Sequence, residues 1–400
     1  MRSYSGEYAD ERAGLQPTAW TRITDRNSRV RQLDWVLLGS AFALTLLGTL
    51  LVYSATRGRN DLHQGDEYFF LVRHLLYFAL ALGLATGVMR LGSGRVRDVA
   101  PVLYVGALVL TAMVLTPLGS TVNGSQRWIE VGAGFAFQPS ELMKVAVILV
   151  MAALVAARAD ADDRGSPDAR TVLECLALAA VPATLIVLTP DLGQTMVVVV
   201  ITLGVLMAAG AARGWIIGLL SAGLLGALAV WQLGLLDQYQ INRFAAFANP
   251  ALDPAGVGYN TNQARIAIGS GGLSGSGLFH GSQTAGQFVP EQHTDFIFTV
   301  AGEELGFFGA GGIILLLGVV LWRALRIARE AADLFGAVVA AGLATWIAFQ
   351  AFENIGMALG IMPVTGLPLP FVSYGGSSMF AVWIAVGLLQ AIRLRARRRC

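Results

Sequence analysis

The stretch that ends at Asp295 brings together side chains able to move a proton or bind a cation. Asp295 stands directly before the apolar run Phe-Ile-Phe-Thr-Val-Ala, so it is expected at the lip of a membrane. With His293 two residues away and Glu303 nearby, its carboxylate could act as a general base or hold a divalent cation, Mg²⁺ or Mn²⁺, through oxygen ligands. The same residue could instead cap the helix that follows, since aspartate is among the best N-cap residues. The two roles do not exclude each other.

A second pair of charges lies in an expected helix. Lys144, the only lysine of the chain, follows Glu141 by three residues, so both share one helix face. One interpretation is an ion pair that neutralises itself near the outer interface. The other is a lysine ammonium that points into an outward-facing cavity and receives an anion such as a phosphate, because ionisable groups inside a membrane usually line pathways or sites.

Three arginines, Arg127, Arg243 and Arg265, are expected on the same outer face. Arg127 precedes Trp128, and the two could lie beside a lipid headgroup, although an aromatic belt at the membrane interface predicts the same indole without a binding role. Asp191, in a Thr-Pro-Asp turn, is expected to cap a helix. The glycine run at 269–277 has no strand-turn-helix context, which favours a close-packed turn over a nucleotide site.

Such residues must be positioned by helices inside a lipid bilayer. Of the 400 residues, 55% are hydrophobic and only 14% charged, and the mean hydropathy is +0.61. Soluble proteins carry roughly 25% charged residues, so this composition excludes an ordinary soluble enzyme. A formal net charge of +2 gives no indication of nucleic-acid binding. The two cysteines provide neither a disulfide framework nor metal-ligand spacing.

We therefore expect an all-α polytopic membrane protein with about ten transmembrane helices. The apolar runs lie at 35–55, 69–89, 99–118, 138–157, 172–189, 192–212, 214–236, 304–322, 334–353 and 371–392. Most basic residues fall on the side of the two termini, which the positive-inside rule places in the cytoplasm. A large outer loop at 237–303 joins helices seven and eight. The remaining divisions are a flexible cytoplasmic tail at 1–34, a membrane domain at 35–393 and a basic C-terminus at 394–400.

Several motifs together resemble the SEDS (shape, elongation, division and sporulation) family. They run from Pro290 to Phe298, from Glu303 to Gly306 and from Pro368 to Ser377, with further matches at 138–144 and 190–193. The resemblance implies a bacterial plasma-membrane peptidoglycan glycosyltransferase that polymerises lipid II on the outer face. It also implies that Asp295 is the essential acid, and that Lys144 and Glu141 are the functional pair of helix four.

The same resemblance implies a partner and a branch of the family. The partner is a class B penicillin-binding protein, which crosslinks the glycan and contacts helices eight and nine and the large outer loop. The segments Gly281 to Gln283 and Met362 to Pro370 are similar to the elongation branch, which works with the elongation machinery. The division and sporulation branches are the alternatives.

This assignment sets two chemical tasks. A base must take the proton of the acceptor's sugar hydroxyl as it attacks an undecaprenyl-diphosphate-linked glycan, and Asp295 is the candidate, directly or through a bound Mg²⁺ or Mn²⁺. Outward cations must neutralise the diphosphate leaving group, with Lys144 and Arg243 preferred over Arg127 and Arg265. The rival functions are a lipid II flippase, which needs a polar path to both faces, and a scaffold without activity.

Overall fold

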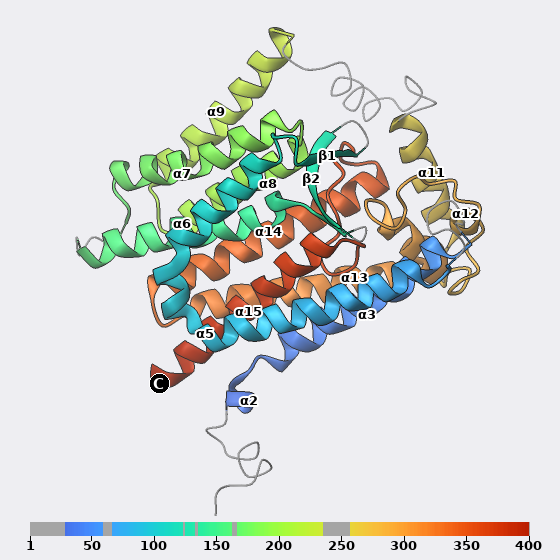
Figure 1. Cartoon of the computed structure of the whole chain (residues 1–400), viewed down its shortest axis with the longest axis horizontal. Helices are drawn as coiled ribbons and strands as arrows, with labels where there is room; N and C mark the ends of the chain where they lie inside the picture. The colour runs from blue at the N-terminus through green and yellow to red at the C-terminus, as the bar shows by residue number, and fades with distance from the viewer. Residues whose placement is uncertain are drawn as a thin grey trace, which may run out of the picture.

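The computed structural model describes residues 29–58, 66–122, 125–132, 135–161, 166–234 and 257–399. Long helices lie side by side and form most of the fold (Figure 1). The helices are α2 (Arg29–Gln32), α3 (Trp35–Thr56), α5 (Phe69–Met113), α6 (Pro139–Ala161), α7 (Ala169–Leu188), α8 (Leu192–Ala208), α9 (Arg213–Gln232), α11 (Val257–Ser270), α12 (Ser282–Ala285), α13 (Ile297–Arg329), α14 (Leu334–Leu359) and α15 (Gly376–Arg399).

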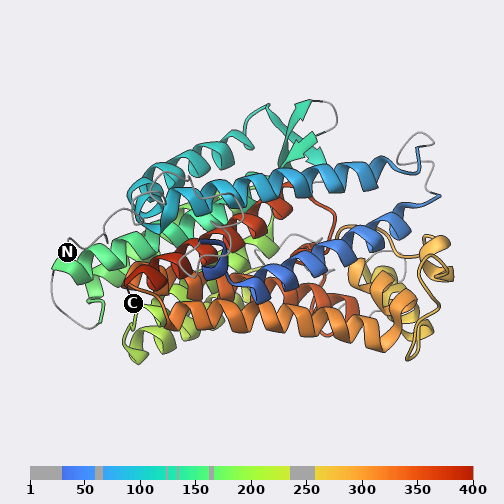
Figure 2. The same ribbon diagram turned by 90° about the horizontal axis from the view of Figure 1, so that it is seen from below.

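Each of the ten expected spans coincides over most of its length with a helix of the structure. Eight helices among the described residues are long and apolar enough to cross a membrane, and α8 is a shorter apolar helix of 17 residues. Helix α5 has 45 residues, about twice the length that a bilayer needs. Gly92 interrupts it with φ 77° and ψ 153°, and the chain turns back there, so α5 holds two spans (Figure 2).

Some boundaries differ from those expected. Helix α13 begins at Ile297 rather than 304, so the described part of the large outer loop ends close to Asp295. The N-cap of α13 is Phe296, which makes no side-chain cap bond, so the N-cap role considered for Asp295 is wrong. Helix α15 continues to Arg399, and the basic C-terminus is therefore largely its last turns.

A small sheet, which we did not predict, covers the outer end of α6. Strands β1 (Gly119–Val122), β2 (Ser125–Gly132) and β3 (Phe135–Phe137) form an antiparallel sheet in that order. Pro139 then starts α6, where its fixed φ suits the first turn and its missing N–H costs nothing. The sheet therefore sets where Arg127 and Trp128 lie relative to the helices.

Helix α14 lies inside the bundle and α9 at its edge. The neighbours of α14 are α6, α8, α11, α13 and α15, and Trp346 at its centre is fully buried. No residue of α9 is buried, and among the helices it packs against α8. Polar groups carried by α14 are thus shielded from lipid, which is where intramembrane polar residues are usually found.

The inner ends of three helices meet at one buried carboxylate. Asp34, 1% exposed, caps α3 by accepting a bond from the Leu37 amide at 3.1 Å. Its Oδ2 also accepts from Arg323 Nε of α13 at 2.8 Å and pairs with Arg393 of α15. The two ends of the membrane domain therefore lie on one side, as expected, and the positive-inside rule makes that side cytoplasmic.

We expect Asp34→Asn to destabilise the protein, because two buried arginines lose their shared counter-charge. Removing one partner of a buried ion pair lowers the free energy of unfolding by about 3–5 kcal/mol. The thermal unfolding midpoint in detergent should therefore fall by several degrees. The matched control is Asp160→Asn, which removes the partner of Arg97 in an ion pair whose carboxylate is 67% exposed. It should leave the midpoint almost unchanged. Equal midpoints for the two variants would contradict a structural role for Asp34.

Candidate active site at the outer end of the bundle

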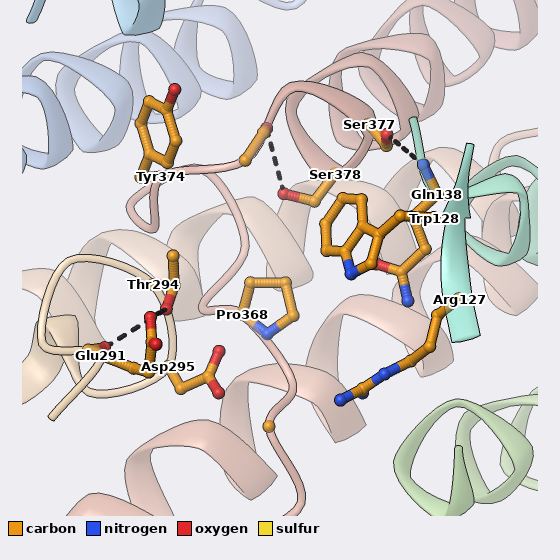
Figure 3. A pocket seen from close by; sticks show the side chains of 12 residues that line it. Arg127, Trp128, Gln138, Glu291, Thr294, Asp295, Pro368, Tyr374, Ser377 and Ser378 are labelled. Carbon is orange, nitrogen blue, oxygen red and sulfur yellow. Dashed lines mark hydrogen bonds between the residues drawn. The ribbon is translucent and has the colours of Figure 1, made fainter. Parts of the chain in front are cut away.

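A cavity of about 210 Å³ opens at the outer end of the bundle. Four segments form it: strand β2, the residue before α6, the loop before α13 and the connection from α14 into α15. The lining residues are Arg127, Trp128, Gln138, Glu291, Thr294, Asp295, Gly366, Pro368, Tyr374, Gly375, Ser377 and Ser378 (Figure 3). The non-helical backbone between α14 and α15 thus lines an outward cavity, the kind of place where irregular backbone at membrane depth is tolerated.

Asp295 is held in this cavity mainly through its backbone. Its amide donates to the Glu291 carbonyl at 3.0 Å, and its carbonyl accepts from Asn354 Nδ2 at 2.7 Å. The same amide group of Asn354 donates to the Leu367 carbonyl at 2.7 Å. Gly366 has φ 75°, and a Cβ there would lie 3.2 Å from Asp295 Oδ2, so glycine leaves room for the carboxylate.

Arg127 and Trp128 come from β2 and form the facing wall. In Figure 3 the Arg127 guanidinium and the Asp295 carboxylate point into the same space from opposite sides. Arg127 Nη1 lies 3.4 Å from Asp191 Oδ2, and its side chain is 21% exposed. Asp191 also accepts from the Gln194 amide at 3.2 Å and so caps α8, as predicted.

The first turn of α15 and the residues before it complete the cavity. Ser377 Oγ accepts a bond from the Gln138 amide at 2.8 Å, which joins α15 to the start of α6. Burial raises the pKa of Tyr374, and its neighbour Tyr77 adds to the rise. The Tyr374 phenol is therefore a hydrogen-bond donor at neutral pH. Tyr374 and Ser377 fell within the family-like motif and Ser378 directly follows it, but their types alone gave no reason to single them out.

Lys144 does not reach the cavity. It is fully buried and pairs with Glu141, itself 1% exposed, with 2.8 Å between Nζ and Oε2. Lys144 Nζ also donates to Gln350 Oε1 at 2.9 Å, and Glu141 Oε1 accepts from Gln194 Nε2 at 2.6 Å. The ion-pair interpretation is therefore the one that the structure shows. The expected ammonium facing an open cavity is wrong, because α14 and α8 enclose the pair.

The buried pair instead belongs to a chain of polar contacts that joins the two walls of the cavity. Gln350 Nε2 donates to the carbonyl of Pro368, a lining residue, at 2.8 Å. In order, the chain is Arg127, Asp191, Gln194, Glu141, Lys144, Gln350 and Pro368. Lys144 and Glu141 thus connect with the site through the side chains of α8 and α14.

Two other predicted binding residues, Glu303 and Arg265, lie outside the cavity lining. Glu303, 1% exposed, accepts from the Thr284 amide at 2.9 Å and the Gln283 amide at 2.7 Å, and so holds α12 in place. Arg265 donates to the Gly360 carbonyl at 2.7 Å, at the C-terminal end of α14. The direct substrate contact expected of Glu303 does not fit its buried position, whereas Arg265 is exposed and its expected contact stays a prediction.

His293 is packed behind the cavity rather than in it. Its ring lies 5.1 Å from the Phe70 ring and 5.8 Å from the Tyr374 ring, and its carbonyl accepts from the Tyr374 amide at 3.0 Å. It therefore ties the α15 connection to the loop of Asp295. Arg243 lies outside the described residues.

The carboxylates of the cavity do not form a closed metal cage. The described residues contain no group of three or more His, Cys, Asp or Glu side chains placed to hold a metal ion. Asp295 and Glu291 both line the cavity, and Mg²⁺ commonly uses one or two carboxylates together with substrate phosphates and water. These two residues suit a metal ion shared with a diphosphate substrate.

The fold and the cavity define a polytopic membrane protein with a carboxylate and an arginine facing each other at the outer membrane lip. A family model described as "Cell cycle protein", which covers FtsW, RodA and SpoVE, matches residues 34–398. The chain belongs to this family, the one that its motifs resemble, and it is a multi-pass protein of the bacterial cell membrane.

Individual relatives cover nearly the whole chain. The probable peptidoglycan glycosyltransferase FtsW of Tolumonas auensis is 38% identical over 91% of this chain and 93% of that protein. Stage V sporulation protein E of Bacillus subtilis is 37% identical over 89% and 95%. Among solved structures, a chain of a peptidoglycan synthase complex, described as coordinating polymerization and crosslinking, is 31% identical, with a TM-score of 0.75 over 92% and 98%. The rod shape determining protein RodA of Thermus thermophilus is 29% identical, with a TM-score of 0.64 over 90% and 96%.

Proposed function

We propose that the protein is a peptidoglycan glycosyltransferase that polymerises lipid II into glycan strands on the outer face of the plasma membrane. The observation that carries this proposal is that Asp295 and Arg127 face each other across one cavity at the outer membrane lip. Relatives that share more than a third of their residues with this chain bear the name of this activity. A lipid-linked substrate can meet such a site from the bilayer while its sugars lie in water.

The cavity supplies the two groups that glycosyl transfer needs. The Asp295 carboxylate takes the proton of the acceptor's sugar hydroxyl, and that oxygen attacks the anomeric carbon of the donor with inversion. Arg127 receives the diphosphate that leaves, through charge-assisted hydrogen bonds. Trp128 offers a flat apolar face beside it. A Mg²⁺ or Mn²⁺ ion held by Asp295 and Glu291 would add charge neutralisation of the diphosphate.

We place the protein in the division branch of the family rather than the elongation branch expected from its motifs. The division relatives named FtsW are 34–38% identical to this chain, and the sporulation relative 37%, while the RodA structure is 29% identical. These identities over the whole chain weigh more in this proposal than the likeness of the motifs at 281–283 and 362–370 to the elongation branch. The test is complementation: this gene should restore septation to cells depleted of their division member and should not restore rod shape to cells that lack the elongation member.

The proposed partner is a class B penicillin-binding protein, whose transmembrane helix packs on α13 and α14. Both helices expose aromatic rings there, with Phe307, Phe308 and Phe352 more than half exposed. At Gly311 and Gly312 of α13, an added Cβ would meet no atom within 4 Å, so another helix can approach the backbone closely. The related synthase complex, described as coordinating polymerization and crosslinking, supports a partner of this kind.

The experiment that tests the function supplies labelled lipid II to the purified protein with its partner, with and without Mg²⁺ or Mn²⁺. Glycan strands on a gel would support the transferase. If no strands form and the same preparation translocates lipid II in liposomes, the flippase replaces the transferase. The structure favours the first outcome, since inward of Lys144 the face of α6 consists of apolar residues from Val145 to Ala156.

We expect Arg127→Ala to lower kcat/KM about 10- to 100-fold, because a hydrogen bond to a charged group is worth about 1.5–3 kcal/mol. Arg127→Lys should recover part of the loss, since it keeps the charge without the planar fork. Initial rates of strand formation at varied lipid II concentration give the comparison. Arg97→Ala, on the inner face, serves as the control and should not change kcat/KM. An Arg127→Ala protein with wild-type kcat/KM would show that Arg127 does not contact the substrate.

A further inference from the structure

A second cavity lies at the opposite, inner end of the bundle. Its volume is about 360 Å³, and it is formed by the turn inside α5 and the C-terminal part of α15. The residues that line it are Arg90, Leu91, Gly92, Ser93, Gly94, Arg95, Ala391, Arg395 and Arg398. The catalytic chemistry does not use any of them. Four of the nine side chains are arginines, so the cavity is strongly cationic.

Within the described residues these arginines are poorly neutralised. Arg395 pairs with Asp333 at 2.9 Å, but within the described part of the chain no carboxylate pairs with Arg90, Arg95 or Arg398. Arginine is the side chain best suited to phosphate, because its planar group donates two parallel hydrogen bonds. A cavity with this lining is complementary to an anion that carries several acceptor oxygens.

A buried hydroxyl in the same cavity adds an independent indication of a ligand. Ser93 is only 3% exposed, and its Oγ has no hydrogen-bond partner among the described residues. Buried polar groups are normally paired, so an orphaned hydroxyl in a cavity indicates that something else bonds to it. At Gly94 a Cβ would lie 3.2 Å from Arg395 Nη1, so the small residues of the turn let that guanidinium lie against the backbone.

An apolar cavity adjoins the cationic one. Its volume is about 390 Å³, it lies between α5, α6 and α15, and Leu91 lines both cavities. Its other lining residues include Val96, Leu103, Leu142 and Leu388. A soluble anion has no apolar part that could fill this cavity. A phospholipid has both a phosphate for the cationic cavity and acyl chains for the apolar one.

We propose that the inner cavity binds the phosphate of an anionic phospholipid from the cytoplasmic leaflet, with part of an acyl chain in the adjoining apolar cavity. Arg90, Arg95, Arg395 and Arg398 surround the phosphate, and Ser93 donates to it. The positive-inside rule accounts for arginines at this face. It does not account for a cavity, an orphaned hydroxyl or an apolar space beside them.

The test measures binding of phosphatidylglycerol to the delipidated full-length protein in detergent by native mass spectrometry. Each arginine near an anionic membrane is worth about 1 kcal/mol, so removing two should weaken binding about 30-fold. The test variant is therefore Arg90→Gln with Arg398→Gln. The matched control, Arg213→Gln with Arg329→Gln, removes the same charge from the same face outside the cavity and should change binding less than twofold. Ser93→Leu, which fills the cavity without changing charge, should also weaken binding.

Three results would overturn the proposal. Equal losses in the test and control pairs would mean that the charge of the inner face acts diffusely. Equal retention of phosphatidylcholine and phosphatidylglycerol by the wild type would mean that the anionic headgroup is not recognised. Displacement of the lipid by glycerol 3-phosphate at similar concentration would mean that the cavity takes a soluble phosphate. Unchanged gel-filtration profiles and unfolding midpoints in each variant ensure that a loss of binding reflects the site.

Discussion

Replacing Asp295 by asparagine should lower the rate of glycan synthesis by about 10²- to 10⁴-fold, the range of general base catalysis. The substitution keeps the size of the side chain and the backbone bonds that hold the residue to Glu291 and Asn354. It removes only the ability to take a proton or hold a cation. The measurement is the initial rate of strand formation from labelled lipid II at saturating substrate, because the loss is expected in kcat.

Glu291→Gln is the matched control for Asp295→Asn, since both carboxylates line the same cavity. If Asp295 works as the base alone, Glu291→Gln should cost less than tenfold and chelation of divalent cations should leave the wild-type rate unchanged. If the two residues share a metal ion, chelation should abolish synthesis, and added Mg²⁺ should partly restore Glu291→Gln. A rate within tenfold of wild type for Asp295→Asn would reject Asp295 both as the catalytic base and as a metal ligand.

The membrane fold could be predicted because lipid imposes simple demands on sequence. Every expected span is helical, since backbone groups inside hydrocarbon must bond within their own helix. The turn at Gly92 and the start of α13 were harder to place. Apolar runs mark where a helix is buried in lipid, and α13 extends beyond the membrane lip into the outer loop. The small sheet was missed because its strands are short and lie next to a helix start.

A residue of the candidate site could be predicted only where its type and its expected depth in the membrane were enough to indicate a function. Asp295 and Arg127 were found because each is a charge at the outer lip. For Lys144 the sequence offered the ion pair with Glu141 that the structure shows, but it could not exclude an open cavity, because Gln350, which also bonds the buried ammonium, is 206 residues away. Glu303 was assigned to substrate for a similar reason: the amides of Gln283 and Thr284 that engage it lie 20 and 19 residues before it in the chain. Gln350 and Asn354 did carry a usable signal, since polar side chains in a spanning helix are costly and usually functional.

Asn354 gives the second large prediction: Asn354→Leu should lower kcat by about 10- to 100-fold and leave KM nearly unchanged. The amide of Asn354 joins the Asp295 carbonyl to the Leu367 carbonyl, with 2.7 Å to each, and it is fully buried. Leucine has the same number of side-chain heavy atoms and the same branching but donates no hydrogen bond, so the two segments are free to separate. A misplacement of about 1 Å at a reacting group can cost 10²-fold, even when the mutated residue never touches substrate.

A positioning role can be distinguished from a merely structural one. Thr345→Val, on the same helix, removes a hydroxyl that bonds only to the Ala341 carbonyl of its own helix, and it should leave kcat unchanged. Loss of stability would reduce the amount of active enzyme and lower both variants' rates in step with their unfolding midpoints. A positioning role instead predicts that correctly folded Asn354→Leu protein, assayed at equal concentration, is slow in kcat alone. If its loss appears in KM, or disappears when folded protein is matched, Asn354 supports the fold and does not position Asp295. The geometry favours the first result, because Asn354 joins two segments that both adjoin the carboxylate. One is the backbone of Asp295 itself. The other is Leu367, the residue after Gly366, where an added Cβ would lie 3.2 Å from Asp295 Oδ2.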